Sequence, residues 1–200
     1  MIYTLVADGT SDRVLLPILT WSLKHQQVTP VVAQWADFSR IPRQQNTEGR
    51  LRTALELYPC DVLFVHRDAE AQPSALRREE IANALRWASV RHIPVVPVRM
   101  TEAWLLADEG AIRSAAGNPN GMEDLNLPGI RRLEDLPDPK RVLHDALTTA
   151  SGLNAGRRSR LPIRQRVQLI TNYIDDYSRL TVIPAFQALQ RDIRVLIDNL

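Results

Sequence analysis

The chain has 200 residues, of which 44% are hydrophobic and 24% are charged, and its formal net charge is +2 at pH 7. This composition does not indicate disorder and excludes a polycation, so any affinity for nucleic acid must come from a local basic patch. Cys60 is the only cysteine, which excludes an internal disulfide and a cysteine-rich zinc site.

The first predicted element is a strand over residues 2–7, which runs directly into Asp8 and Gly9. Residues 11–24 follow with apolar side chains at helical spacing. Pro17 lies inside this stretch and predicts a bend or a delayed start of the helix. Gly9 suits the tight turn between strand and helix, where main-chain N–H groups come close to a ligand.

A second unit of the same kind ends in two acids. Residues 28–33 predict the second strand, and residues 47–58 predict a helix. The third strand, over residues 61–65, leads into Asp68 and Glu70. An apolar run followed at once by acids is typical of a central parallel strand with carboxylates at its carboxyl edge, where open α/β sheets bind ligands.

Two residues between this strand and its acids have open interpretations. His66 is either a metal ligand or proton shuttle, or a half-buried histidine that is bonded to the backbone. Arg67 is either a charge partner for the acids or a phosphate contact.

A polar loop leads to a helix that Ser74 is expected to cap and that ends near Val90. The fourth strand covers residues 93–99, and its two prolines indicate the edge of the sheet, because proline cannot donate to a ladder. Thr101 resembles an N-cap, which places Glu102 in the first turn of the next helix. Glu102 either interacts with the helix dipole or faces the same cleft as the other acids.

The character of the sequence changes after residue 116. Residues 117–139 are rich in turn sequences, and Asp138 caps a helix that begins with proline. A final helix is expected over residues 183–200. We therefore divide the chain into an α/β domain over residues 1–116 and, over residues 117–200, an irregular linker with a helical extension packed on that domain.

Residues 156–166 form a basic run without an acid. Such a run is a candidate phosphate-binding surface. A merely solvated loop is the alternative, because basic runs are common on protein surfaces.

The alternation of strands and helices predicts an α/β fold of Rossmann-like character. We expect a parallel four-stranded sheet in the order 2-1-3-4, with helices on both faces. If the first and third strands are neighbours, Asp8, Asp68 and Glu70 converge, and a hard divalent cation such as Mg²⁺ relieves their repulsion. The alternative is that Asp8 and Asp68 only cap the helices that follow them.

Three stretches carry a family resemblance: residues 65–70 (VHRDAE), 98–108 (VRMTEAWLLAD) and 138–140 (DPK). An acid with Gly after the first strand, and Asp-x-acid after the third, resembles the TOPRIM fold of topoisomerases, primases and certain nucleases. Together the stretches resemble small bacterial TOPRIM-like proteins, often encoded beside an ATPase in phage-defence operons. The resemblance covers most of the chain. TOPRIM proteins usually have Glu at the position of Asp8 and Asp at the position of Glu70, so this chain exchanges the lengths of both side chains.

The resemblance implies a metal-dependent nuclease that cleaves phosphodiester bonds of DNA or RNA and works with an ATPase partner. Mg²⁺ or Mn²⁺ would be held by Asp8, Asp68 and Glu70, and Glu102 would join these acids in catalysis. The residues expected to bind the substrate are Arg67, Lys140, Arg157, Arg158 and Arg160. One alternative is a catalytically inactive TOPRIM-like subunit that binds or regulates the ATPase. Another is a small-molecule phosphotransfer or nucleotide-hydrolysing enzyme, although the missing Gly-x-x-x-x-Gly-Lys loop argues against an ordinary P-loop NTPase.

The location and partners follow from what the sequence contains. No apolar run approaches the roughly 20 residues that span a bilayer, and Met1 is followed by a strand instead of a signal peptide. We therefore expect a cytoplasmic protein without a membrane partner. Nucleic acid and an ATPase are the expected partners, and a homo-oligomer is left open.

Overall fold

A computed structural model describes residues 1–41, 46–69 and 72–199. The chain forms two compact units, one made of Met1–Val96 with Ala188–Leu200 and the other of Pro97–Gln187. Each unit is described by itself below. The division into domains over residues 1–116 and 117–200 stays a prediction.

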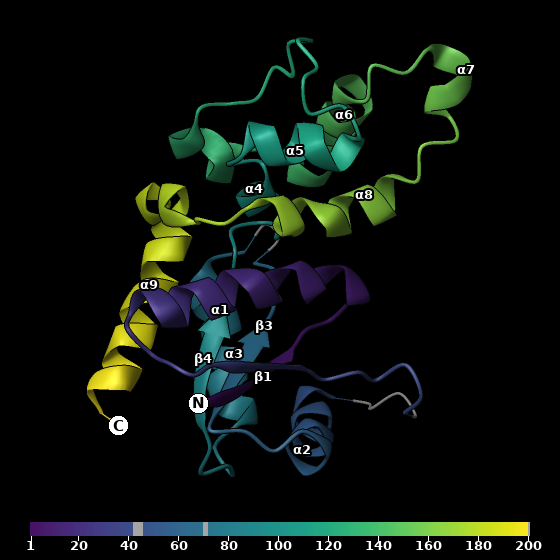
Figure 1. Ribbon diagram of the computed structural model, residues 1–200. Coiled ribbons are helices and arrows are strands. Elements are labelled where there is room, and N and C mark those ends of the chain that lie inside the picture. The colour runs from purple at the N-terminus through teal and green to yellow at the C-terminus, as the bar shows by residue number, and fades with distance from the viewer. Residues whose placement is uncertain (42–45, 70–71, 200) are drawn as a thin grey trace. The chain divides into compact units, whose positions relative to one another are not determined.

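A parallel sheet of four strands forms the centre of the first unit (Figure 1), in the order β2-β1-β3-β4. The strands are β1 (Ile2–Val6), β2 (Val32–Trp35), β3 (Val62–His66) and β4 (Arg91–Val95). All of β3 is buried, as expected for a central strand. The predicted parallel sheet and its strand order are confirmed.

The predicted bounds of the second and fourth strands are wrong at both ends, since β2 ends at Trp35 and β4 begins at Arg91. The second strand was expected from residue 28, but the N–H of Val28 donates to the carbonyl of Leu23 at 3.1 Å and so closes the preceding helix. β2 begins at Val32, whose N–H donates to the carbonyl of Met1 at 2.9 Å. The fourth strand ends at Val95 instead of continuing to residue 99, because Pro97 has no N–H to give to a ladder. β4 is an edge strand, as its prolines predicted.

The helices of the first unit are η1 (Thr10–Val14), α1 (Leu15–His25), α2 (Thr47–Leu57), α3 (Ser74–Ala84) and the later part of α9 (Pro184–Asp198). The α-helical part begins at Leu15, so Pro17 lies in the first turn, where a missing N–H costs nothing. The predicted delayed start is confirmed. The helix expected to reach Val90 ends at Ala84, because the backbone tightens into turns whose N–H groups donate three residues back, as from Ala88 to Leu85. Ser74 was expected to cap this helix but is its first helical residue, because the N-cap position belongs to Pro73.

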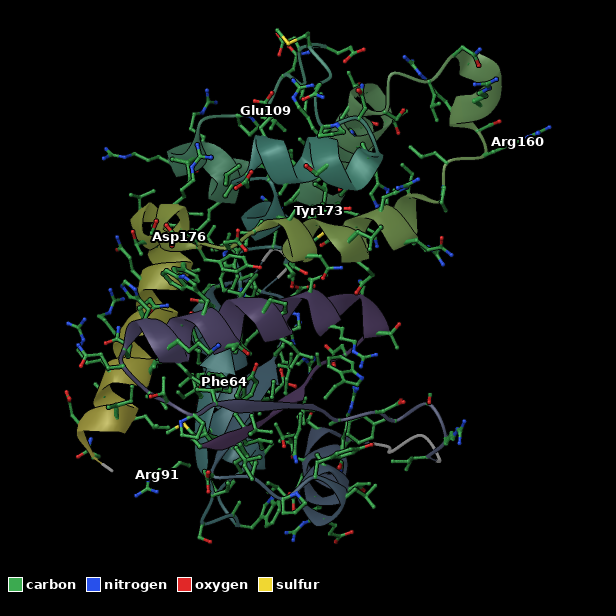
Figure 2. The ribbon with its side chains drawn as sticks, viewed as in Figure 1. Phe64, Arg91, Glu109, Arg160, Tyr173 and Asp176 are labelled. Carbon is green, nitrogen blue, oxygen red and sulfur yellow. The ribbon has the colours of Figure 1, made fainter. Side chains whose placement is uncertain are left out.

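Helices cover both faces of the sheet, as predicted. On one face, Leu63 and Val65 pack with Leu51 of α2 and Ile81 of α3. On the other face, the hydroxyl group of Tyr3 donates to the carbonyl of Leu16 in α1 at 2.8 Å. The rings of Tyr3 and Phe64 meet edge to face at 5.2 Å, and Figure 2 labels Phe64 in the sheet. Each large apolar side chain buried in this way contributes about 1.5–3 kcal/mol.

The second unit is helical in the described part of the chain. Its elements are α4 (Glu102–Leu105), α5 (Glu109–Ala116), η2 (Ile130–Asp135), α6 (Pro139–Ala150), α7 (Ala155–Arg158), α8 (Ile163–Ile170), η3 (Thr171–Tyr173), η4 (Ser178–Val182) and the first turn of α9. Trp104 is buried and meets the ring of Phe186 edge to face at 5.4 Å. Asp138 caps α6 as predicted, since its side chain accepts from the N–H of Arg141 at 2.9 Å. None of the described helices is long and apolar enough to span a membrane.

Candidate functional site

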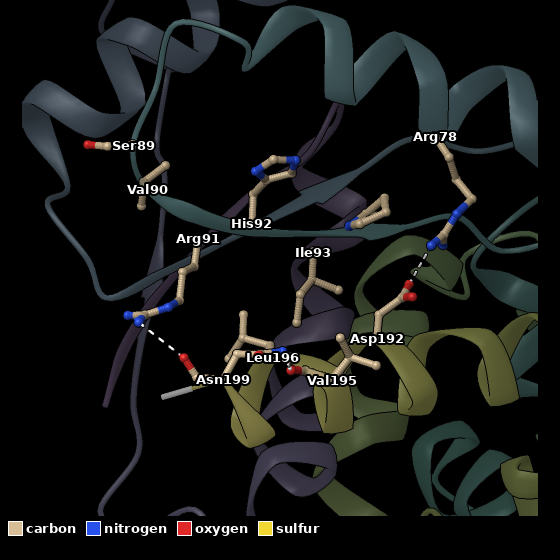
Figure 3. A pocket seen from close by; sticks show the side chains of 11 residues that line it. Arg78, Ser89, Val90, Arg91, His92, Ile93, Asp192, Val195, Leu196 and Asn199 are labelled. Carbon is tan, nitrogen blue, oxygen red and sulfur yellow. Dashed lines mark hydrogen bonds and ion pairs between the residues drawn. The ribbon is translucent and has the colours of Figure 1, made fainter.

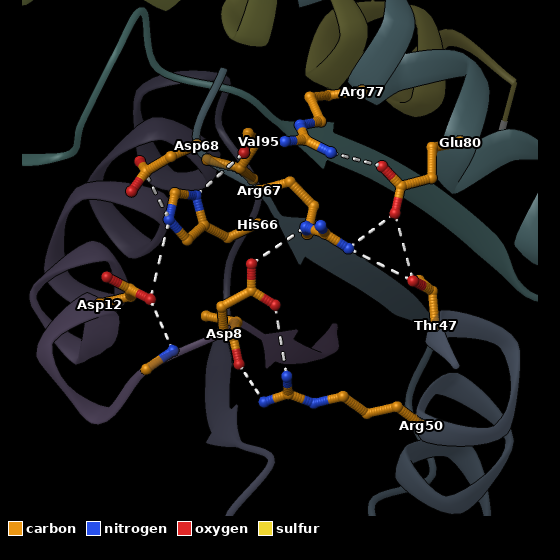
Figure 4. A network of polar contacts seen from close by, with 12 residues as sticks. Asp8, Asp12, Thr47, Arg50, His66, Arg67, Asp68, Arg77, Glu80 and Val95 are labelled. Carbon is orange, nitrogen blue, oxygen red and sulfur yellow. Dashed lines mark hydrogen bonds and ion pairs between the residues drawn. The ribbon is translucent and has the colours of Figure 1, made fainter. Parts of the chain in front are cut away.

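The carboxyl ends of β1 and β3 bring two of the predicted acids to one edge of the sheet. Val6 pairs with Val65 at the ends of these neighbouring strands, and Asp8 and Asp68 follow shortly after. Glu70, the third predicted metal ligand, lies outside the described residues. Figure 4 shows the polar network that surrounds the two described acids.

Asp8 is held between two arginines. Its Oδ1 atom lies 3.3 Å from Nη1 of Arg50, and its Oδ2 atom lies 3.0 Å from Nε of Arg67. The alternative that Asp8 and Asp68 cap helices is wrong, because the N-cap positions belong to Gly9 for η1 and to Pro73 for α3. The charge of Asp8 is therefore balanced by cations from α2 and from the end of β3.

Arg50 was not predicted as a site residue. In the structure its side chain is 28% exposed, and Nη2 donates to the carbonyl of Ala7. Its guanidinium lies over the ring of Phe38, 4.6 Å from the ring centre. Burial lowers the pKa of Arg50, and the Asp8 carboxylate opposes this effect. The sequence carried no signal for this role beyond the positive charge.

Arg67 connects Asp8 to a second acid. Its Nη1 atom lies 2.7 Å from Oε1 of Glu80 in α3 and 3.3 Å from Oγ1 of Thr47 in α2. The other oxygen of Glu80 lies 3.0 Å from Nη1 of Arg77. Burial raises the pKa of Glu80, but the hydrogen bond from Arg77 and the charge of Arg67 outweigh burial, so this pKa lies below its ordinary value.

His66 at the end of β3 is bonded to the backbone, as one of its two interpretations stated, but it is buried instead of half-buried. Its Nδ1 atom lies 3.1 Å from the carbonyl oxygen of Val95. A carbonyl can only accept, so Nδ1 carries the proton and donates. Nε2 lies 3.5 Å from Oδ1 of Asp68 and 3.8 Å from Oδ2 of Asp12. Burial lowers the pKa of His66, against the opposing charge of Asp12.

Asp12 is a third acid of this edge that the sequence-based prediction missed. Its Oδ2 atom accepts the N–H of Gly9 at 2.9 Å, and Oδ1 accepts the hydroxyl of Ser11 at 3.3 Å. An acid three residues after an N-cap position often reaches back to that N–H, and this spacing was the available signal. Asp12 and Asp68 therefore approach the same atom of His66 from different segments.

The carboxylate oxygens at this sheet edge are of the type that Mg²⁺ prefers as ligands. Among the residues with described positions, no group of three His, Cys, Asp or Glu side chains could hold a metal ion. Both oxygens of Asp8 face guanidinium groups. A cation at this edge therefore requires Asp8 to turn away from at least one arginine.

The other predicted site residues belong to the second unit, so their placement with respect to Asp8 stays a prediction. Glu102 is the first residue of α4, and Lys140 lies exposed in the first turn of α6. Arg157, Arg158 and Arg160 are exposed on α7 and just after it, and Arg160 projects outward in Figure 2. The Nε atom of Arg158 donates to the carbonyl of Leu153 at 2.7 Å.

A groove of about 550 Å³ runs between β4 and the later part of α9 (Figure 3). Its apolar surface comes from Val90, Ile93, Val195 and Leu196, among other residues. An ion pair of 2.6 Å between Arg78 and Asp192 closes one end. The strand-end acids do not line this groove, so we treat it as separate from the candidate site.

Comparison of the chain with protein-family models, with curated proteins and with solved structures found no match. The resemblance to TOPRIM proteins therefore stays a prediction from the quoted motifs.

Proposed function

We propose that the chain is a Mg²⁺- or Mn²⁺-dependent nuclease that cleaves phosphodiester bonds of DNA or RNA at the carboxyl edge of β1 and β3. The observation that carries this proposal is the pairing of Val6 with Val65, which brings Asp8 and Asp68 to one sheet edge beside Arg67. Effector work with an ATPase partner in phage defence is part of the proposal and rests on the sequence resemblance alone.

In this proposal Asp8, Asp68 and Glu70 hold the cation, which when bound polarises the phosphate and stabilises the attacking and leaving oxygens. Arg67 contacts the phosphate of the substrate. His66 is fixed by the carbonyl of Val95, and its Nε2 atom lies 3.5 Å from Oδ1 of Asp68.

In this proposal the second unit contacts the nucleic-acid strand away from the cleaved bond. Lys140, Arg157, Arg158 and Arg160 carry charges that would bind the sugar–phosphate backbone without reading its sequence. Glu102 would act as a further acid of the catalytic group.

A second candidate function is a catalytically inactive subunit that binds or regulates the ATPase. It is favoured by the two arginines that face the oxygens of Asp8 at 3.3 Å and 3.0 Å. An acid neutralised in this way can have a purely structural role, in which it holds α2 and β3 together.

Asp68→Asn distinguishes the two candidates, because it keeps the size of the side chain and removes its charge. A nuclease should lose at least about 100-fold of its cleavage rate, as for other groups that stabilise transition-state charge. Its melting temperature should stay similar or rise, because the loss of one negative charge relieves the repulsion between neighbouring carboxylates. Asp8→Asn should also abolish cleavage. Binding of Mn²⁺, followed by electron paramagnetic resonance, should fall in parallel in both variants.

The control is Asp61→Asn at the opposite end of β3, where Asp61 accepts the N–H of Ile2 at 2.6 Å. This variant should cleave at the wild-type rate. The substrates are single- and double-stranded DNA and RNA, with Mg²⁺ or Mn²⁺. Wild-type protein that is inactive on all of them, even with its genomic neighbour present, rejects the nuclease in favour of the binding subunit.

A further inference from the structure

The carboxylate of Asp8 occupies the place between two guanidinium groups that suits a phosphate. Its two oxygens face different arginines, Arg50 at 3.3 Å and Arg67 at 3.0 Å (Figure 4). Guanidinium groups bind phosphate through the same parallel N–H···O contacts that they make with carboxylates. Because the Asp8 side chain is 56% exposed, a ligand from solvent can reach this position.

Both arginines are held by partners other than Asp8. Arg50 donates to the carbonyl of Ala7 and lies over the ring of Phe38. Arg67 donates to Glu80 at 2.7 Å and to Thr47 at 3.3 Å. The two cations therefore keep their places when the Asp8 carboxylate leaves, so little ordering is required on binding.

The charges of this side of the network favour an anion. Three guanidinium groups, those of Arg50, Arg67 and Arg77, are in contact with only two carboxylates, those of Asp8 and Glu80. The other two acids of this edge, Asp12 and Asp68, face His66 instead. When Asp8 turns away, one carboxylate remains beside three cations. A phosphodiester group, with one negative charge and two free oxygens, replaces the lost carboxylate in charge and in number of acceptors.

We propose that Arg50 and Arg67 form a phosphate clamp. When no substrate is bound, the Asp8 carboxylate occupies the phosphate position between the two arginines. A substrate phosphate displaces the carboxylate from both arginines, and the displaced Asp8 then becomes available to the cation. This second step rests on the proposed function. Phosphate and cation consequently favour each other's binding, because a bound phosphate releases Asp8 for the cation and a bound cation keeps Asp8 away from the two arginines.

The test measures binding of short fluorescein-labelled DNA and RNA strands by fluorescence anisotropy, at low salt and in EDTA. Asp8→Asn should bind about three- to tenfold more tightly than wild type, since it removes two competing ion pairs of ordinary surface strength. Arg50→Gln and Arg67→Gln should weaken binding. In the double variant Asp8→Asn with Arg50→Gln, the gain should disappear. Inorganic phosphate should displace the labelled strand at lower concentration from Asp8→Asn than from Glu48→Gln.

Glu48 and Arg52 supply matched controls on the same helix as Arg50. They pair with each other at 2.8 Å on the exposed face of α2. Glu48→Gln removes one negative charge and Arg52→Gln one positive charge, as the test variants do. Each control should change the affinity by less than about twofold, which is the effect of net charge alone. Melting curves show whether every variant is folded.

The clamp is overturned if Asp8→Asn binds no more tightly than Glu48→Gln, or if its gain survives the loss of Arg50. The nuclease is judged separately, from Mn²⁺-dependent cleavage by the wild-type protein. Tighter binding by Asp8→Asn without any cleavage by the wild-type protein supports the clamp and rejects the nuclease. Cleavage without tighter binding supports the nuclease and rejects the clamp.

Discussion

Arginine side chains have different surroundings in two regions of this protein, the sheet edge around Asp8 and the basic run over residues 156–166. At the sheet edge of the first unit, Arg50 and Arg67 are 28% and 21% exposed, and both contact Asp8. In the second unit, residues 154–160 are all exposed. There Arg158 donates to a carbonyl only five residues away.

This difference shows why a basic run is a poor guide to a binding site. Residues 156–166 were the sequence-based candidate for a phosphate-binding surface, because they concentrate positive charge locally. Arg50 lies outside this run, yet it reaches a carboxylate 42 residues away. An arginine whose position is determined by several partners loses less entropy when it binds a ligand than an exposed one.

The largest expected effect on stability comes from His66, at the buried end of β3. This residue supports the polar network around Asp8, and no residue of the basic run over 156–166 has a comparable place. His66→Ala should lower the free energy of unfolding by about 2–4 kcal/mol, because it leaves a cavity and removes the donor to the carbonyl of Val95. His92→Ala on the partly exposed part of β4 is the control, with an expected loss of less than about 1 kcal/mol. Urea denaturation measures both values. Equal losses of stability in the two variants would show that His66 does not support the polar network at the sheet edge.

Arg67→Gln should have the next largest effect, because it removes one of the two cations that contact Asp8 and one of the two that contact Glu80. We expect a loss of about 1–3 kcal/mol in the free energy of unfolding, in the range of hydrogen bonds to charged groups. Arg160→Gln makes the same change in the basic run and should alter stability by less than about 0.5 kcal/mol. Comparable losses in the two variants would contradict the distinction between the regions.

Arg166, at the end of the basic run, should have a smaller but measurable structural role. Its Nη1 atom donates at 3.1 Å to the carbonyl of Ala115, in the last turn of α5. Arg166→Gln should therefore cost about 0.5–1.5 kcal/mol. Hydrogen exchange near the end of α5 should accelerate in this variant and stay unchanged in Arg164→Gln. Unchanged hydrogen exchange in both variants would show that Arg166 does not stabilise the end of α5.

The smallest expected effect is a pH dependence that comes from Glu80. Because its pKa is lowered in the folded protein, its ionised form stabilises the fold above the ordinary carboxyl value. This contribution is lost as the pH falls from about 4.5 through the lowered pKa. Glu80→Gln should lower the melting temperature near neutral pH and reduce its decline on acidification. A parallel decline in wild type and variant would show that Arg67 and Arg77 do not stabilise this carboxylate.

The amino-acid sequence by itself determined the sheet and the edge that carries the acids. Apolar runs that alternate with amphipathic helices permit few arrangements other than a parallel sheet, and the structure has the predicted order of strands. The prolines near β4 identified the sheet edge, because proline cannot donate a ladder hydrogen bond. Since Asp8 and Asp68 follow neighbouring strands, their shared edge was also predictable. All of these features follow from local patterns.

Only the tertiary structure decided which side chains meet at that edge. Asp8 pairs with Arg50 and Arg67, and Asp12 approaches His66, although nothing in the local sequence connects these segments. Partners of this kind depend on the register of strands and on the side of α2 that faces the sheet. A shift of one residue in either would turn a different side chain toward the site. Spacing in the sequence therefore identifies the acids, whereas packing determines which cations neutralise them.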